Sequence, residues 1–248
     1  MSEIRIGTSG WHYASWRGPF FPDYVPKKDW LRFYATQFDS AELNAPFYRT
    51  PTLDAVKEWQ AQTPADFRFA WKASKFITHW KRLSAKSKNS IALMETRLKP
   101  LGKKAGPVLF QLPPRFEADP ERLESFIKLL KKRRSYVFEF RHPSWYTKEI
   151  YAVLRKHNAA LCFSDHIDAP APWEVTAHHI YIRAHGTNGR YAGSYSGKTL
   201  KEWARKIRAW HRARRDVYCY FDNDTKSAAP FDALRLMRFV NGSSQTSP

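Results

Sequence analysis

The stretch YVFEFRHPSWY, residues 136–146, contains the pattern that decides the fold. In its first half, the apolar Phe138 and Phe140 alternate with the charged Glu139 and Arg141. Successive side chains of a β-strand point to opposite faces, so one face here is apolar and the other is charged. Strands of a parallel sheet are usually apolar on both faces. The stretch therefore predicts a strand that packs one face against helices and turns its charged face into a barrel.

Further short runs of β-forming residues recur along the chain, each followed by a helical pattern. The eight runs are residues 4–7, 40–44, 67–72, 108–112, 136–140, 160–163, 180–183 and 217–221. Eight strands that alternate with helices predict a closed parallel sheet. The 248 residues suit one such barrel, which takes ~250 residues, and no Gly/Ser/Pro-rich linker divides the chain. The sequence thus predicts an α/β fold, a single-domain TIM-type (β/α)8 barrel at residues 1–240, with a flexible tail at 241–248.

Several of the helices carry recognisable start signals. Asp119 followed by Pro120 predicts an N-cap and a helix to about Arg133. Thr199 with Glu202 three residues later matches a capping box and predicts a helix to about Arg214. Similar patterns predict helices over 52–62, 147–157 and 231–240.

The inward-facing parity of the strands is polar. It holds Glu42, Asn44, Arg68, Lys72, Gln111, Glu139, Arg141, Asp165, Arg183, His185 and Asp222. Most of these positions fall near the carboxyl ends of the strands, where barrel enzymes place their active sites. A buried charge is costly unless it is paired. The set therefore indicates either a ligand site or a salt-bridged interior, for example with Arg68 or Lys72 paired to Glu139.

This set suits acid–base chemistry on an anionic ligand. Glu42, Glu139 and Asp165 are candidate general acids or bases, if their surroundings separate their pKa values. The cations Lys72, Arg141 and Arg183 suit a phosphate or carboxylate. His142 and His185 are candidate proton carriers.

A divalent metal has weaker support. Glu42, Glu139, Asp165, His185 and Asp222 are all residue types that bind metals. However, the sequence has no HxxxH or HxH pair, and the inward cations would repel a metal. The sequence therefore predicts no cofactor, and the ligand spacing gives a metal no support.

Basic residues exceed acidic ones, 42 to 23, for a formal charge of +19. Much of the excess lies in residues 72–104 and 198–215. Within the second run, Trp203, Ile207 and Trp210 are spaced as the core-facing stripe of a helix, which leaves the basic residues on its outer face. Such a face is either a solvated surface or a surface that contacts phosphates nonspecifically.

Two glycine-containing loops are rich in aromatic residues, at 9–18 and 190–197. They include Trp11, Tyr191 and Tyr195, and rings of this kind stack on bases or sugars or simply pack over a barrel rim. Cys162 and Cys219 fit no disulfide or metal-binding spacing. The chain has no apolar signal segment at its start and no run of ~18 apolar residues. These features predict a cytoplasmic protein with no membrane association and no obligate protein partner.

Several motifs resemble those of the DUF72 family, also called YecE-like. They are IRIGTSGW at 4–11, FDSAELNAPFYRTP at 38–51, FRFAWKASKFITHWKRL at 67–83, GPVLFQLPPRF at 106–116, FEFRHPSWY at 138–146, YIRAHG at 181–186, YAGSYS at 191–196 and YFDND at 220–224. The resemblance covers nearly the whole chain and implies a TIM-type barrel, but it implies no activity. The last motif departs from the family's usual YFNND, because Asp222 replaces an Asn and adds a carboxylate at the mouth.

The sequence predicts an enzyme that acts on a phosphate-bearing ligand, with nucleic acid (DNA or RNA) or a nucleotide as the first candidate. The proposed catalytic residues are Glu42, Glu139, His185 and Asp165. The proposed ligand-binding residues are Trp11, Asn44, Tyr48, Lys72, Lys75, Gln111, Arg141, His142, Arg183, Tyr191, Tyr195 and Asn223. One alternative is an isomerase, lyase or hydrolase of a small phosphosugar or other anionic metabolite. Another is a non-catalytic protein that binds nucleic acid through its basic helices.

Overall fold

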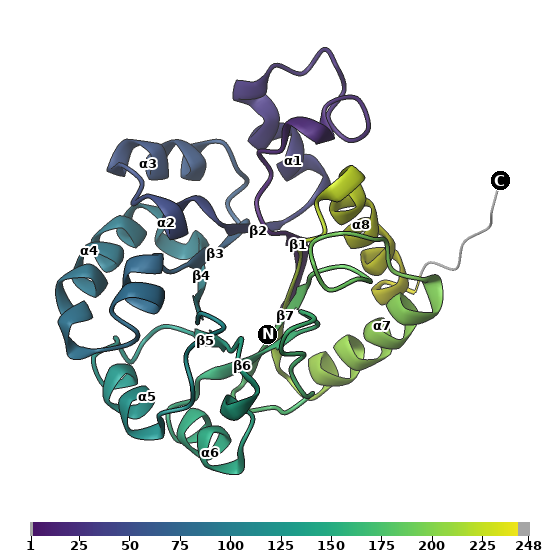
Figure 1. The fold of residues 1–248 in the computed structure, drawn as a ribbon. Coiled ribbons are helices and arrows are strands. Elements are labelled where there is room, and N and C mark those ends of the chain that lie inside the picture. Colours follow the sequence, from purple (N-terminus) through teal and green to yellow (C-terminus); the bar gives the residue numbers. More distant parts are fainter. Residues whose placement is uncertain (1, 243–248) are drawn as a thin grey trace.

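The computed structural model describes residues 2–242, and eight parallel strands form a barrel ringed by helices (Figure 1). The strands are β1 (Ile4–Thr8), β2 (Ser40–Leu43), β3 (Arg68–Lys72), β4 (Ala105–Gln111), β5 (Tyr136–Glu139), β6 (Ala160–Ser164), β7 (His179–Ala184) and β8 (Asp216–Phe221). From β2 to β8 each strand pairs with the next one in sequence, and β8 pairs with β1. The predicted TIM-type barrel is confirmed. Of the predicted tail at 241–248, residues 243–248 lie outside the described part of the chain.

A helix follows every strand of the barrel except β6. The helices are α1 (Trp30–Gln37), α2 (Ala45–Tyr48), α3 (Leu53–Ala61), α4 (Lys88–Leu98), α5 (Pro120–Ile127), α6 (Lys148–Lys156), α7 (Gly197–Arg212) and α8 (Ala228–Val240). Between β6 and β7, residues 165–178 cross without a helix. There Trp173 packs against Phe163, Trp203 and Trp210. No helix within residues 2–242 has the length and apolarity needed to cross a bilayer.

Two predicted helix ends were wrong. The helix capped by Asp119 ends at Ile127, before the predicted Arg133. The capping box at Thr199 is also wrong, because Ser196 is the N-cap and accepts a hydrogen bond from the backbone N of Thr199. The start of α7 is thus set by a local cap three residues before the one predicted.

The predicted two-faced strands are confirmed. The outer core between strands and helices contains Phe69, Phe110, Phe138, Ile182 and Phe221. A smaller apolar cluster fills the lower interior of the barrel, and its members are Ala70, Leu109, Val137, Ala160, Cys162, Ala177, Tyr181, Tyr218 and Tyr220. Polar residues occupy the layer above it, toward the carboxyl ends of the strands. The strand alternation therefore places a charged layer on an apolar floor.

Arg68 lies at the opposite end of the barrel from this charged layer. It begins β3, and its Nε lies 3.5 Å from a carboxylate oxygen of Glu3. The predicted pairing of Arg68 or Lys72 with Glu139 is wrong, because Arg141 and Arg183 are the ion-pair partners of Glu139.

The junction of β1 and β2 closes the barrel with little backbone pairing. Within residues 2–242, the two strands share one isolated bridge, between Ser9 and Glu42. The hydroxyl of Tyr34 on α1 connects them further, because it accepts from the backbone N of Thr8 at 2.9 Å and donates to the carbonyl O of Ser40 at 3.0 Å. One side chain thus supplies contacts that a regular ladder would make through the backbone.

We expect Tyr34→Phe to destabilise the protein by about 1–3 kcal/mol for each buried backbone group left without a partner. The phenyl ring keeps the packing and removes only the bridging hydroxyl. Urea denaturation followed by circular dichroism measures the effect, with Tyr24→Phe as control because Tyr24 is 84% exposed. Equal stability of the two variants would show that the hydroxyl does not hold this junction.

Candidate active site at the barrel mouth

Arg183, at the carboxyl end of β7, is the centre of the charged layer. Its guanidinium is fully buried and donates to Glu42 through Nε and Nη2, to Glu139 through Nη1 at 2.9 Å, and to Asp222 through Nη2 at 2.7 Å. The same Nη2 donates to the Ser9 hydroxyl at 3.0 Å. One cation therefore joins carboxylates from β2, β5 and the end of β8. The sequence predicts that Arg183 binds phosphate. In the structure its N–H donors already form hydrogen bonds with these carboxylates and with Ser9.

These contacts keep the inner carboxylates ionised. Burial by itself raises the pKa of Glu139, but the neighbouring Arg141 and Arg183 outweigh it and hold that pKa well below the usual range. Glu42 behaves alike, since Arg183, Lys72 and hydrogen bonds from Ser9 and Tyr181 lower its pKa against the effect of burial. Both carboxylates are therefore anions near neutral pH.

His185 lies between the two arginines. Its Nε2 is 3.0 Å from Nη2 of Arg141 and 3.0 Å from Nη1 of Arg183. Guanidinium groups only donate hydrogen bonds, so this nitrogen accepts and carries no proton. The ring proton then resides on Nδ1, which lies 3.4 Å from Asp165. In this arrangement Nε2 of His185 accepts hydrogen bonds from both arginines.

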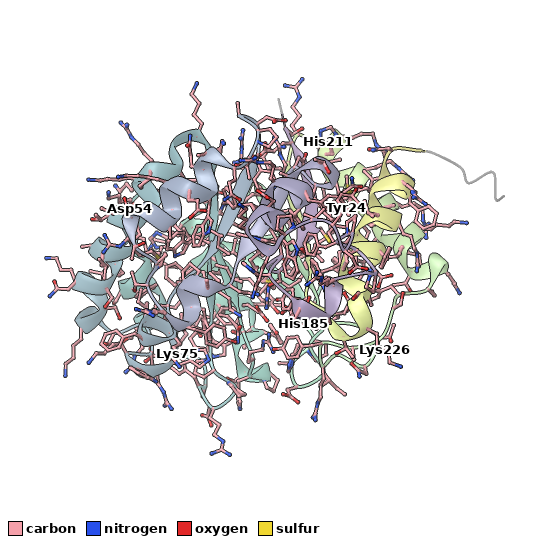
Figure 2. All side chains as sticks on the ribbon, turned by 90° about the horizontal axis from the view of Figure 1, so that it is seen from above. Tyr24, Asp54, Lys75, His185, His211 and Lys226 are labelled. Atoms are coloured by element: carbon pink, nitrogen blue, oxygen red, sulfur yellow. The ribbon has the colours of Figure 1, made fainter. Side chains whose placement is uncertain are left out.

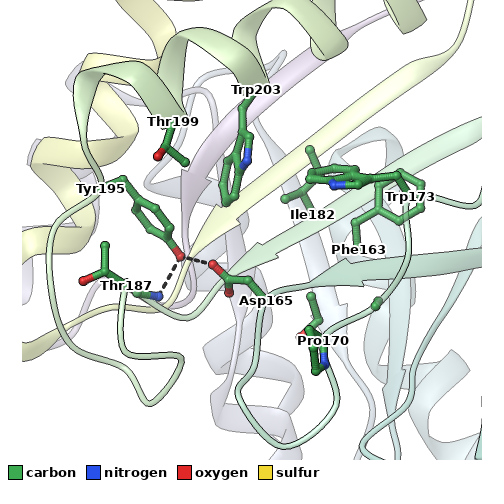
Figure 3. Close-up of a pocket in the computed structure, with 12 residues that line it drawn as sticks. Phe163, Asp165, Pro170, Trp173, Ile182, Thr187, Tyr195, Thr199 and Trp203 are labelled. Atoms are coloured by element: carbon green, nitrogen blue, oxygen red, sulfur yellow. Dashed lines mark hydrogen bonds between the residues drawn. The ribbon is translucent and has the colours of Figure 1, made fainter. Parts of the chain in front are cut away.

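Asp165 and Tyr195 organise the loop above His185. The carboxylate of Asp165 accepts from the backbone N of His185 at 2.7 Å and from the hydroxyl of Tyr195. Tyr195 in turn accepts from the backbone N of Gly186 at 2.7 Å (Figure 3). This network faces a pocket of about 430 Å³ between β6, β7 and α7, next to the crossover that has no helix. Asp165 and the buried Tyr195 thus hold the shape of the β7–α7 loop.

Lys72, the last residue of β3, differs from the arginines. It is 7% exposed, and its Nζ forms no hydrogen bond or ion pair with any residue in 2–242. The Nζ lies 4.5 Å from the centre of the Phe47 ring. Burial, with a contribution from Arg183, lowers the pKa of Lys72 to about 8. This is an amine whose protonation changes close to neutral pH.

Two histidines that the predicted site omitted lie beside the mouth. The nearby cations help to lower their pKa values. Burial and then Lys72 and Arg141 lower the pKa of His79 to about 4. Burial, Arg141 and His185 do the same for His166, to about 4. Both rings are therefore neutral near pH 7. His166 follows β6 by two residues, so its position after a strand is the signal that could have identified it.

The rim of the mouth carries exposed aromatic rings. Tyr48 is 70% exposed and Trp80 is 66% exposed, and the Nζ of Lys75 lies 5.9 and 5.7 Å from their ring centres. We call Tyr48, Lys75 and Trp80 the aromatic rim. Figure 2 shows Lys75 on the same side of the barrel as His185 and Lys226, with His211 on the opposite side. The aromatic rim and the charged layer therefore share one end of the barrel.

The other predicted ligand-binding residues lie in three settings. Gln111 ends β4 in register with Glu139, and the half-exposed Tyr191 packs against His185. His142 interacts with Ser144 and caps the turn after β5. Three others make contacts within the fold: Trp11 is buried against Trp59 and Phe69, Asn44 donates to Ser9, and Asn223 donates to Gly193 and Asp232. Trp11 and Asn44 also line a pocket of about 280 Å³.

Asp224 is a further acidic residue that the predicted site omitted. Burial and the nearby Asp222 raise its pKa to about 8, against a hydrogen bond from Tyr13. Its Oδ1 is buried and has no partner among the described residues. The mouth thus holds ionised carboxylates and one that keeps its proton near pH 7. Within residues 2–242, no group of three or more His, Cys, Asp or Glu side chains is arranged to hold a metal ion.

These features define a TIM-type barrel protein with a charged, arginine-centred site at the carboxyl end of its strands. The chain belongs to the family described as "Protein of unknown function DUF72", whose profile matches residues 5–248.

Similar proteins cover almost the same length. YunF of Bacillus subtilis (strain 168), a UPF0759 protein, is 23% identical over 271 residues, with 96% of this chain and 95% of YunF covered. YecE of Escherichia coli (strain K12) is 27% identical over 234 residues, with 84% and 82% covered. The crystal structure of a DUF72 family protein from Thermotoga maritima matches with a TM-score of 0.86 at 26% identity, with 96% and 99% covered. The predicted family and fold are both confirmed.

We expect Arg183→Met to destabilise the protein by about 3–5 kcal/mol at pH 8, because three buried carboxylates lose their shared cation. Without Arg183, burial raises the pKa values of Glu42 and Glu139, so these two carboxylates take up protons as the pH falls toward 5. The deficit relative to the wild type should therefore shrink at pH 5. In the wild type, the lowered pKa of Glu139 stabilises the fold above pH 4.5, and that contribution is lost as the pH falls further.

Chemical denaturation at both pH values tests this expectation. Arg155→Met is the control, since Arg155 pairs with Glu174 on the surface and exposed pairs contribute at most about 1 kcal/mol. A deficit for Arg183→Met that is small or independent of pH would contradict the role given to Arg183.

Proposed function

We propose that this protein is an enzyme that acts on a phosphate-bearing ligand at the barrel mouth, with nucleic acid or a nucleotide as the favoured ligand. The aromatic rim carries this proposal. Large rings that remain 66–70% exposed beside a lysine form the type of surface on which bases stack while a cation contacts the backbone.

The charges inside the mouth fit a phosphate group below the rim. Among residues 2–242 Lys72 has no acidic partner within ion-pair distance. Arg141 and Tyr191 both contact His185. The neutral His79 and His166 and the amide of Gln111 add hydrogen-bonding groups without adding negative charge. In this proposal Lys72 and Arg141 contact phosphate, whereas Arg183 holds the carboxylates in place.

The acid–base roles follow from the separated pKa values. Glu139 and Glu42 stay ionised, which is the state that a base must have to activate a water molecule in a phosphodiester hydrolase. The cations that keep them ionised also weaken them as bases. Asp224, whose pKa is raised to about 8, suits the proton donor better than His185. Two groups of the same chemical type with separated pKa values are the usual basis of acid–base catalysis.

A small phosphosugar is the second candidate, because the cations of the mouth lie deep. Lys72 is 7% exposed and Arg141 is 5% exposed, so only a compact group reaches both. A thermal-shift experiment with ribose 5-phosphate and with single-stranded DNA separates the two candidates. Stabilisation by the sugar phosphate alone favours the phosphosugar.

We expect Trp80→Ala and Lys75→Ala each to weaken binding of a fluorescein-labelled single-stranded DNA. Loss of one stacking ring costs about 1–3 kcal/mol, or roughly 5- to 150-fold in affinity. Fluorescence anisotropy at low and moderate salt measures the effect, and affinity should fall as salt rises.

Arg205→Ala, on the outer face of α7, is the matched control and should bind like the wild type. If Arg205→Ala weakens binding as much as Trp80→Ala does, the basic helices bind nucleic acid instead of the mouth. Absence of DNA binding at low salt would remove the nucleic-acid part of the proposal.

A further inference from the structure

Two lysines of this protein are buried, and their amines have different contacts. Lys104 is 6% exposed, and its Nζ donates to the carbonyl O of Gln60 at 2.5 Å and of Thr63 at 2.7 Å, and to the Thr63 hydroxyl at 3.1 Å. Lys72 is similarly buried, at 7% exposure, but among residues 2–242 its Nζ has no hydrogen-bond or ion-pair partner and lies 4.5 Å from the centre of the Phe47 ring. Its Nζ is not one of the fully enclosed polar atoms that lack a partner, so the amine keeps access to the mouth without a protein hydrogen-bond partner.

The surroundings of Lys72 explain why no acid pairs with it. The charged and titratable groups that act on it come from four strands and from the turn after β3. They are Glu42, Glu139, Arg183, Asp222 and His79. Its three carboxylates all pair with Arg183, and Glu139 also pairs with Arg141. The arginines therefore satisfy the acids and leave the amine of Lys72 available.

An available amine that loses its proton near neutral pH is a nucleophile. We propose that Lys72 forms a Schiff base with the carbonyl carbon of an aldehyde or ketone in a phosphorylated sugar. This inference rests on the proposed function and names the reacting group of its ligand. Two sources share this chemistry: a free sugar phosphate, and the ring-opened deoxyribose of an abasic site in DNA.

The bond changes balance without another reactant. The amine nitrogen attacks the carbonyl carbon, a C–N bond forms, and the C–O bond breaks. Two of the three ammonium protons leave with the oxygen as water, and the third stays on the iminium nitrogen. The iminium carries the same single positive charge as the ammonium. Three cations, Lys72, Arg141 and Arg183, thus still face three carboxylates, Glu42, Glu139 and Asp222, and no buried charge becomes uncompensated.

Borohydride trapping tests the inference. The protein is incubated in separate arms with dihydroxyacetone phosphate, with 2-deoxyribose 5-phosphate, and with duplex DNA that contains one abasic site. Sodium borohydride then reduces any Schiff base to a stable secondary amine, and intact mass and peptide mapping locate it. We expect one adduct, on Lys72, with none on Lys104. Because the pKa of Lys72 is about 8, the initial rate should rise about tenfold from pH 7 to pH 9.

Two variants remove the amine in different ways. Lys72→Arg keeps the charge and Lys72→Met keeps the length of the side chain, and both should reduce the adduct at least tenfold to the background of surface lysines. Lys57→Arg, which alters an exposed lysine of α3, should leave the adduct unchanged. Circular dichroism and thermal denaturation confirm that each variant is folded.

The possible outcomes test the Schiff base on Lys72 separately from the proposed function. An adduct on Lys72 with either sugar phosphate supports a free sugar phosphate, and one with abasic DNA alone supports the DNA source. Adducts that persist in Lys72→Arg, or that form on no probe, overturn the Schiff base. If intact single-stranded DNA still binds in that case, the nucleic-acid proposal stands without it. If Lys72 forms an adduct but the protein binds no DNA, the Schiff-base inference stands and the ligand is a small phosphosugar.

Discussion

The buried guanidinium of Arg183 is the interaction on which the mouth of this barrel depends. Three carboxylates that reach the barrel axis from β2, β5 and β8 converge on it. Each would be strongly unfavourable in the apolar interior without a cation. Arginine meets this need because its five N–H donors spread over a plane and can serve several acceptors at once. A lysine ammonium at this position would provide fewer donors from a single point.

The surroundings of the charged layer also determine the protonation states of the other groups of the mouth. Burial is the main cause of the lowered pKa values of His79 and His166, and the nearby Arg141 adds to it, so both imidazoles remain neutral. Burial is also the main cause of the raised pKa of Asp224, and the negative charge of Asp222 adds to it, so Asp224 keeps its proton. The different protonation states therefore follow from burial combined with the charges that lie nearest to each group.

Much of this layer could be predicted from the sequence because strand alternation decides which side chains enter a barrel. The alternation of Phe138, Glu139 and Phe140 was enough to place Glu139 inside. It could not determine the pairs, since the face of a strand does not fix which long side chain reaches which acid. The salt-bridged alternative named Arg68 or Lys72 as an example of a partner for Glu139, whereas Arg141 and Arg183 are its partners. His166 and Asp224 were missed because tertiary contacts, and not strand periodicity, set the course of their loops.

The two buried lysines differ in how their ammonium groups are satisfied. Lys104 donates hydrogen bonds to main-chain carbonyls of the α3 region. Lys72 lies at a comparable depth beside the Phe47 ring, and within residues 2–242 its ammonium has no hydrogen-bond or ion-pair partner. Strained or poorly satisfied groups of this kind concentrate at functional sites, where chemistry outweighs the loss in stability. The unpaired amine, more than the overall positive charge of the chain, therefore marks the point of the barrel mouth at which a ligand reacts.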